Sequence, residues 1–164
     1  MNDKFSSKGL VGIFVLALVV CPTVARAKQS IIVSKEARDL LIPILDAFSK
    51  AQEKQPVDET ENSPFWRGSV LLGALFRNRS SGADEALIVL FDYYLGEANG
   101  ADLLHQVTLR GRKILPYLQR LRRRRPRIPG RNYPRSMLLS DSIRAEFFGN
   151  AISAIRQGQV VGVD

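Results

Sequence analysis

The sequence has little of the chemistry on which many small functional sites depend. Its 164 residues include one cysteine and one histidine. Four Cys or His ligands form a structural zinc site, and two cysteines form a disulfide, so zinc fingers and disulfide-stapled scaffolds are excluded. Hydrophobic residues make up 45% of the chain and charged residues 24%, which is typical of a globular protein. The length suits one domain stabilised by its hydrophobic core.

The chain also lacks a hydrophobic run long enough to cross a membrane. The almost wholly apolar run from Leu10 to Val20 has 11 residues, and even the uncharged stretch from Gly9 to Val24 has only 16, whereas a transmembrane helix needs about 20. Lys4 and Lys8 precede this run, and the small residues of Ala25-Arg26-Ala27 follow it. This order is typical of a cleaved secretory signal peptide. We therefore predict a signal peptide over residues 1–27, with the cut after Ala27.

Two other interpretations of the N-terminus remain open. An uncleaved segment would act as a signal anchor and tether the chain to a membrane. A bacterial lipoprotein would use Cys21, although Val20 is larger than the residue that normally precedes a lipidated cysteine. With cleavage, the mature chain covers 28–164, has no cysteine and carries 21 basic and 15 acidic residues, for a net charge of +6. We expect it to be exported, to a periplasmic or extracellular location.

No stretch of the mature chain has a convincing strand pattern, and apolar residues recur instead at helical spacing. The sequence predicts an all-α fold: about five amphipathic helices in a compact bundle, forming one domain over 28–164. An Arg-rich loop is expected at about 122–135. An alternative is a short HEAT-like stack of two α-hairpins, at 35–78 and 83–121, although no repeat is visible in the residues themselves.

The first two predicted helices begin at serines. Ser34 caps a helix whose apolar face runs from Ala37 to Phe48, and Pro43 inside it predicts a kink. Ser63 and Pro64 start the second helix, which is apolar nearly all round. A helix of that kind is usually buried, so we predict that residues 64–76 form the central helix of the bundle.

Three further helices complete the predicted bundle. One follows a turn at 78–82, carries Asp84 and Glu85 in its first turn, and ends near Gly96. The next runs over 104–121 with a kink at Pro116. The last extends from about Asp141 to Gln157, before Gly158, with these residues facing inward: Phe147, Phe148, Ala151, Ile152 and Ile155.

Acidic residues are absent from the stretch between Arg110 and Arg135, which contains eleven basic ones. On the predicted 104–121 helix, basic residues recur at 3,4 spacing beside the apolar face, which predicts a basic stripe facing solvent. Arg122 and Arg125 would fall on the apolar face, so we expect the helix to leave the core just after Leu121. The predicted partner-binding residues are Arg110, Lys113, Tyr117, Arg120, Arg122, Arg123, Arg124, Arg125, Arg127, Arg131 and Arg135.

Arginine binds carboxylates and phosphates in bidentate fashion. The expected partner is an acidic protein surface or an anionic envelope or matrix component, with an anionic membrane surface as an alternative. Predicted export argues against nucleic acid. A competing interpretation is that the tract is merely solvated, or pairs internally with the acidic loop Asp58–Glu61.

Catalytic patterns are scarce. His105 has no Ser or carboxylate at a recognisable motif spacing, and Asp84 and Glu85 are explained by the helix dipole. No Gly-rich phosphate loop, metal-ligand cluster or nucleophile motif is present, so no cofactor and no metal are predicted. The sequence favours a small exported binding protein over an enzyme. Alternatives are a structural protein associated with a membrane surface and a toxin-neutralising, immunity-type protein.

Overall fold

The computed structural model describes residues 30–53, 60–95, 100–131 and 140–161. These residues form six α-helices, a short 3-10 helix and one pair of two-residue strands, which confirms the all-α prediction. In chain order, the elements are β1 (Ile31–Ile32), α1 (Lys35–Gln52), α2 (Pro64–Arg77), α3 (Ser81–Tyr93), α4 (Gly100–Leu109), η1 (Gly111–Ile114), α5 (Leu115–Arg123), β2 (Pro126–Arg127) and α6 (Asp141–Arg156).

The predicted signal peptide at 1–27 lies outside the described residues, as do Gly96 and the acidic pair Asp58 and Glu59. Among the helices that are described, none combines the length and the apolar character needed to cross a membrane.

Serine hydroxyls cap four of the helices. In each, the side-chain oxygen accepts a hydrogen bond of 3.1 to 3.4 Å from the backbone N–H three residues later. Such a cap contributes about 1 kcal/mol of stability. The caps predicted at Ser34 and Ser63 are confirmed, and Ser80 and Ser140 act in the same way. Helix α1 continues through Pro43 without interruption.

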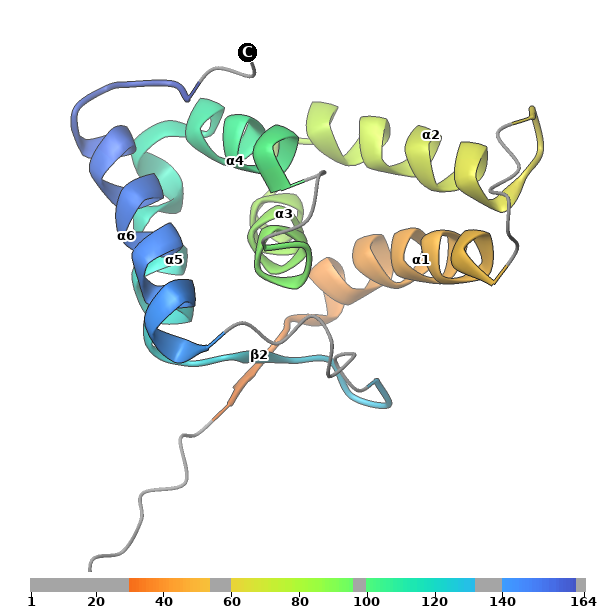
Figure 1. Cartoon of the computed structure of the whole chain (residues 1–164), viewed down its shortest axis with the longest axis horizontal. Coiled ribbons are helices and arrows are strands. Elements are labelled where there is room, and N and C mark those ends of the chain that lie inside the picture. Colours follow the sequence, from red (N-terminus) through yellow and green to blue (C-terminus); the bar gives the residue numbers. More distant parts are fainter. Residues whose placement is uncertain (1–29, 54–59, 96–99, 132–139, 162–164) are drawn as a thin grey trace, which may run out of the picture.

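The central helix is α3, so the prediction that residues 64–76 occupy this place is wrong. Figure 1 shows α3 end-on, with α1 and α2 on one side and α5 and α6 on the other. Ten of its 13 residues are buried, whereas only Gly68 and Leu75 of α2 are buried and Trp66 is 46% exposed. One face of α2 packs closely on α1, because Gly68 leaves room for the ring of Phe48. Its other face stays open.

The helix predicted over 104–121 is divided in two. Gly111 has a φ of +67°, a left-handed conformation that is costly for residues with a Cβ. Helix α4 therefore ends at Leu109, η1 makes the turn, and α5 starts at Leu115. Pro116 lies in the first turn of α5, where it is well tolerated, so it begins a helix instead of kinking one.

This break also removes the second hairpin of the HEAT-like alternative. Residues 83–121 contain α3, α4, η1 and α5. Helix α5 packs against α6, and α3 packs against α1 and α4. The described chain is a compact bundle of six helices, and only α1 and α2 form a simple hairpin.

The described residues include one short parallel strand pair, which was not expected from the sequence. Ile31 lies opposite Pro126. The Ile31 N–H donates to the Arg125 carbonyl at 3.0 Å, and the Val33 N–H donates to the Arg127 carbonyl at 3.2 Å. The start of the predicted basic loop is therefore strand β2. It is held against the segment that leads into α1.

Helix α6 matches its predicted limits closely. Its predicted inward face is confirmed for Phe148, Ala151, Ile152 and Ile155, whereas Phe147 is 38% exposed. Phe147 precedes Phe148 by about 100° on the helix, and Phe148 takes the place toward the core. At the C-terminus, Gly158 has a φ of +71° and bonds back to Ile155, so it ends the helix as predicted.

Candidate functional site

Two of the predicted binding residues, Arg110 and Lys113, pair with the buried carboxylate of Asp84, and Arg110 is itself buried although the sequence placed it on an exposed stripe. Arg110 is 5% exposed. Its guanidinium donates to the carbonyl oxygens of Asn78 at 2.6 Å and Leu75 at 3.0 Å, at the C-terminus of α2. Asp84 lies 3.4 Å from Arg110 and 2.7 Å from the amine of Lys113. The turn at Gly111 causes this difference, because it takes Arg110 off the axis of α5.

Burial lowers the pKa of Arg110, and the nearby carboxylate of Asp84 opposes that effect. Asp84 thus has a structural role beyond the helix dipole, as the partner of two cations. Glu85 accepts a hydrogen bond of 3.3 Å from the backbone N–H of Ser34. These contacts give Asp84 and Glu85 structural roles in the fold.

Two more of the predicted residues are paired with carboxylates. Arg125 forms an ion pair of 3.2 Å with Asp141, and Arg131 pairs with Asp46. The basic tract is thus partly neutralised within the molecule, by these two carboxylates and by Asp84. Arg127 is exposed on β2, and Arg135 lies outside the described residues.

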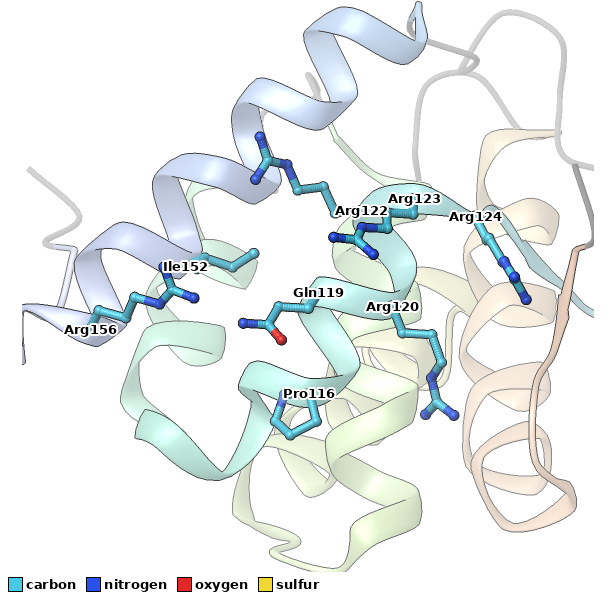
Figure 2. A pocket seen from close by; sticks show the side chains of 8 residues that line it. All are labelled: Pro116, Gln119, Arg120, Arg122, Arg123, Arg124, Ile152 and Arg156. Atoms are coloured by element: carbon cyan, nitrogen blue, oxygen red, sulfur yellow. The ribbon is translucent and has the colours of Figure 1, made fainter.

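The remaining predicted arginines gather around one cavity between α5 and α6. This cavity, which we call the arginine groove, has a volume of about 580 Å³. Figure 2 shows Arg122 and Arg123 extending from the end of α5 toward α6, while Gln119 and Arg156 point toward one another across the groove. Its lining residues are Pro116, Gln119, Arg120, Arg122, Arg123, Arg124, Ile152 and Arg156.

The arginine groove has a strong charge imbalance. Five of its eight lining residues are arginines and none is acidic. In the described part of the chain, none of these five arginines forms an ion pair with a carboxylate. Arg120 instead lies over the ring of Tyr117, 5.2 Å from its centroid. This contact gives Tyr117 a place beside the groove.

Part of this arrangement follows from helix physics. Arg120, Arg122 and Arg123 occupy the last turn of α5, where positive charge complements the helix dipole. Helix α5 ends at Arg123, two residues beyond Leu121, close to the predicted exit from the core. The dipole favours cations at this end, but it does not require five of them around one cavity.

A buried arginine that sequence reasoning missed holds the end of α5 in place. Arg144 of α6 is 3% exposed. Its guanidinium donates to the carbonyl oxygen of Leu121, to that of Arg122 at 3.3 Å and to that of Arg124 at 3.5 Å. It also pairs with the buried carboxylate of Asp92 in α3. Arg144 therefore positions the backbone from which the groove arginines extend.

The Arg144–Asp92 pair lies in the core of the molecule. The two side chains are 4% and 1% exposed, and the Arg144 guanidinium lies 4.8 Å from the Phe148 ring centroid. Burial raises the pKa of Asp92, against the lowering effects of Arg144 and Arg125. The burial of Arg144 could have been predicted from the sequence. Arg144 precedes three residues of the predicted buried face of α6 at helical spacings of 4, 3 and 4: Phe148, Ala151 and Ile155.

Arg156 was also missed, since it stands outside the acid-free stretch. It reaches the groove because α6 packs antiparallel beside α5, which places its last turn near the start of α5 (Figure 2). Gln119, Pro116 and Ile152 complete the lining and were not predicted as site residues. The partners of a cavity between helices depend on packing, which helical spacing alone does not specify.

A cavity of about 500 Å³ between α1 and α2 offers a comparison. Its charged lining residues are Asp46, Lys50 and Arg67, and the other lining residues are Pro43, Ala47, Asn62 and Pro64. The charges there are of both signs, so the arginine groove is distinguished by its composition and not by its size.

The lone histidine connects α4 to the C-terminal segment. His105 Nδ1 lies 2.6 Å from the Val161 carbonyl oxygen, and the Val161 N–H donates to the Thr108 hydroxyl at 3.2 Å. Within the described residues, no group of three or more His, Cys, Asp and Glu side chains is placed to hold a metal ion.

Comparisons of the chain with models of protein families, with curated proteins and with solved structures found no match. The residues of the arginine groove are therefore the basis for a functional proposal.

Proposed function

We propose that this chain is a small binding protein whose arginine groove holds an acidic segment of a partner protein. One observation carries the proposal: five arginines surround one cavity whose lining contains no carboxylate. Like charges brought together in this way repel one another, and a bound anion relieves that repulsion. The predicted signal peptide at 1–27 would place this binding outside the cytoplasm.

Arginine suits carboxylate binding for geometric reasons. Its planar guanidinium donates two parallel hydrogen bonds to a carboxylate, and each hydrogen bond to a charged group contributes about 1.5–3 kcal/mol. Arg122 and Arg123 extend toward α6, and Arg156 approaches from α6 itself. Carboxylates in the groove would therefore meet donors from both helices.

The uncharged lining favours a peptide over a simple anion. Pro116 and Ile152 contribute apolar surface, and Gln119 contributes an amide that both donates and accepts hydrogen bonds. The volume of about 580 Å³ lies in the usual range for ligand pockets. An acidic segment with an apolar side chain would use all three kinds of surface.

Binding is favoured over catalysis by the same lining. Proline, glutamine, arginine and isoleucine supply no nucleophile and no general base that acts near neutral pH. His105 is engaged with the C-terminal segment and is not among the lining residues. Toxin neutralisation by an immunity-type protein is one form that such binding would take.

The proposal is tested by changing Arg120, Arg122, Arg123 and Arg124 together to Gln. We expect the purified protein to bind a fluorescein-labelled oligoglutamate peptide, and this variant to bind it at least about 100-fold more weakly. Fluorescence anisotropy at 0.15 M salt measures the affinity. Circular dichroism establishes that the variant keeps its helices.

The matched control removes the same charge elsewhere. Four exposed basic residues outside the groove, Arg67, Arg77, Arg112 and Arg127, are changed to Gln. We expect this control to bind within about threefold of the parent protein at 0.15 M salt, where charges beyond about 8 Å are screened. Equal weakening in both variants would show that net charge alone attracts the peptide, and the proposal would fail.

A further inference from the structure

A second cavity adjoins the arginine groove at the end of α5. Its volume is about 320 Å³, and its lining residues are Ser30, Arg122, Arg123, Arg125, Asp141 and Arg144. It lies where the segment before β1, the end of α5 and the start of α6 meet. Two of its arginines already have carboxylate partners, since Arg125 pairs with Asp141 and Arg144 pairs with Asp92.

Arg122 and Arg123 line both cavities. These two arginines are therefore shared by the two cavities. The Arg122 guanidinium lies along α6 near Gly149, 3.7 Å from the position that a Cβ would take there. Because Arg144 binds the Arg122 and Arg124 carbonyl oxygens, the backbone at this junction is fixed.

We propose that the two cavities form one elongated site for an extended acidic peptide with two separate carboxylate clusters. This inference rests on the proposed function and specifies its ligand. One cluster binds in the arginine groove near Arg156, and the other lies beyond Arg122 and Arg123, on the side of Ser30. The pair Arg122 and Arg123 contacts the peptide between its two clusters.

The shape of the site favours a peptide over a membrane or a small ion. Both cavities are recesses between elements of the fold, which the planar surface of a bilayer fills poorly. A single carboxylate or phosphate would occupy one cavity and leave the other without an anion. The apolar surface of Pro116 and Ile152 also suits a peptide side chain, and an inorganic polyanion has no group for it.

The test compares two labelled peptides of equal length. One has two glutamate pairs joined by a short neutral spacer, with a leucine beside the first pair. In the other peptide, the second pair is replaced by glutamines. We expect the peptide with two pairs to bind at least about tenfold more tightly, because it makes additional charge-assisted hydrogen bonds.

Two substitutions separate the cavities. Arg156→Gln affects the arginine groove alone, and Ser30→Glu places a negative charge in the second cavity alone. Ser30→Glu should weaken the peptide with two pairs by about tenfold and change the single-pair peptide by less than about twofold. Ser81→Glu, at the exposed start of α3, is the charge-matched control and should change neither affinity. Circular dichroism and urea unfolding verify each fold.

The outcomes separate this inference from the proposed function. If Arg156→Gln weakens both peptides and Ser30→Glu weakens neither, the second cavity is unused and the inference fails, while the proposed function stands. If neither peptide binds the parent protein, both proposals fail. If vesicles containing anionic phospholipid displace the two-pair peptide and bind more tightly at equal charge, the occupant is a membrane and the inference is wrong.

Discussion

At the scale of single residues, two buried arginines organise the molecule in the same way. Arg110 binds carbonyl oxygens at the end of α2 and pairs with Asp84. Arg144 binds carbonyl oxygens at the end of α5 and pairs with Asp92. Each arginine thus donates to carbonyl oxygens at a helix end and complements the helix dipole there. Both carboxylates come from α3, so the central helix neutralises both cations.

Arg144→Gln should therefore be strongly destabilising. The substitution leaves Asp92 as a buried carboxylate without its partner, and breaking a buried ion pair in this way costs about 3–5 kcal/mol. Urea denaturation followed by circular dichroism measures the free energy of unfolding. Arg112→Gln, at an exposed position, should change it by less than about 0.5 kcal/mol. A loss below about 1 kcal/mol in Arg144→Gln would contradict the structural role given to this residue.

Residue-scale reasoning from the sequence identified part of the candidate site. Arg120, Arg122, Arg123 and Arg124 were predicted as binding residues and line the arginine groove. For these four arginines, the absence of acidic neighbours in the sequence correctly predicted the absence of an ion-pair partner among the described residues. The same criterion failed for Arg110, because folding brings distant charges together: Asp84 is 26 positions away in the sequence and 3.4 Å away in the structure.

At the scale of elements, helix starts were more predictable than helix ends. Ser34 and Ser63 were identified as caps because each precedes a periodic apolar face, and both serve as caps. The break between α4 and α5 was missed because apolar residues keep helical spacing on both sides of it. Gly111 marks the break through its positive φ, a backbone property that apolar periodicity does not report.

Gly111→Ala should consequently destabilise the protein by about 1–2 kcal/mol, because a Cβ is unfavourable at a φ of +67°. Gly73→Ala is the matched control. Gly73 lies inside α2, where a Cβ would have ordinary contact at 3.7 Å with the Arg77 side chain, so this change should stabilise the helix by about 0.5–1 kcal/mol. Thermal and urea unfolding of both variants measure the difference. Stabilisation by Gly111→Ala would contradict the described turn.

At the scale of the whole molecule, charge is unevenly divided along the sequence that follows the predicted signal peptide. Residues 28–109 carry a net charge of −4, and residues 110–164 carry +10. Folding brings acidic side chains of the first part to basic ones of the second, as in the pairs of Asp46 with Arg131, Asp84 with Arg110 and Asp92 with Arg144. These pairs leave an excess of positive charge, and five of the remaining arginines surround the arginine groove.

The sequence predicted the fold class of the molecule but not the arrangement of its helices. Periodicity indicated helices, and the all-α fold is confirmed. Which helix is central depends on its neighbours: apolar residues lie nearly all round α2 in the sequence, but it is α3 that is packed between the two sides of the bundle. The arginine groove likewise depends on the packing of α6 beside α5, so Arg156 could not be assigned from the acid-free stretch.

The most direct test of the central claim is an NMR titration of the arginine side chains. The Nε–Hε signals of the purified protein are assigned by single Arg→Lys substitutions and followed while oligoglutamate peptide is added. We expect saturable shifts at Arg120, Arg122, Arg123, Arg124 and Arg156, with smaller shifts at exposed arginines such as Arg67 and Arg77. Shifts of equal size at all exposed arginines, or none at the groove residues, would contradict the account.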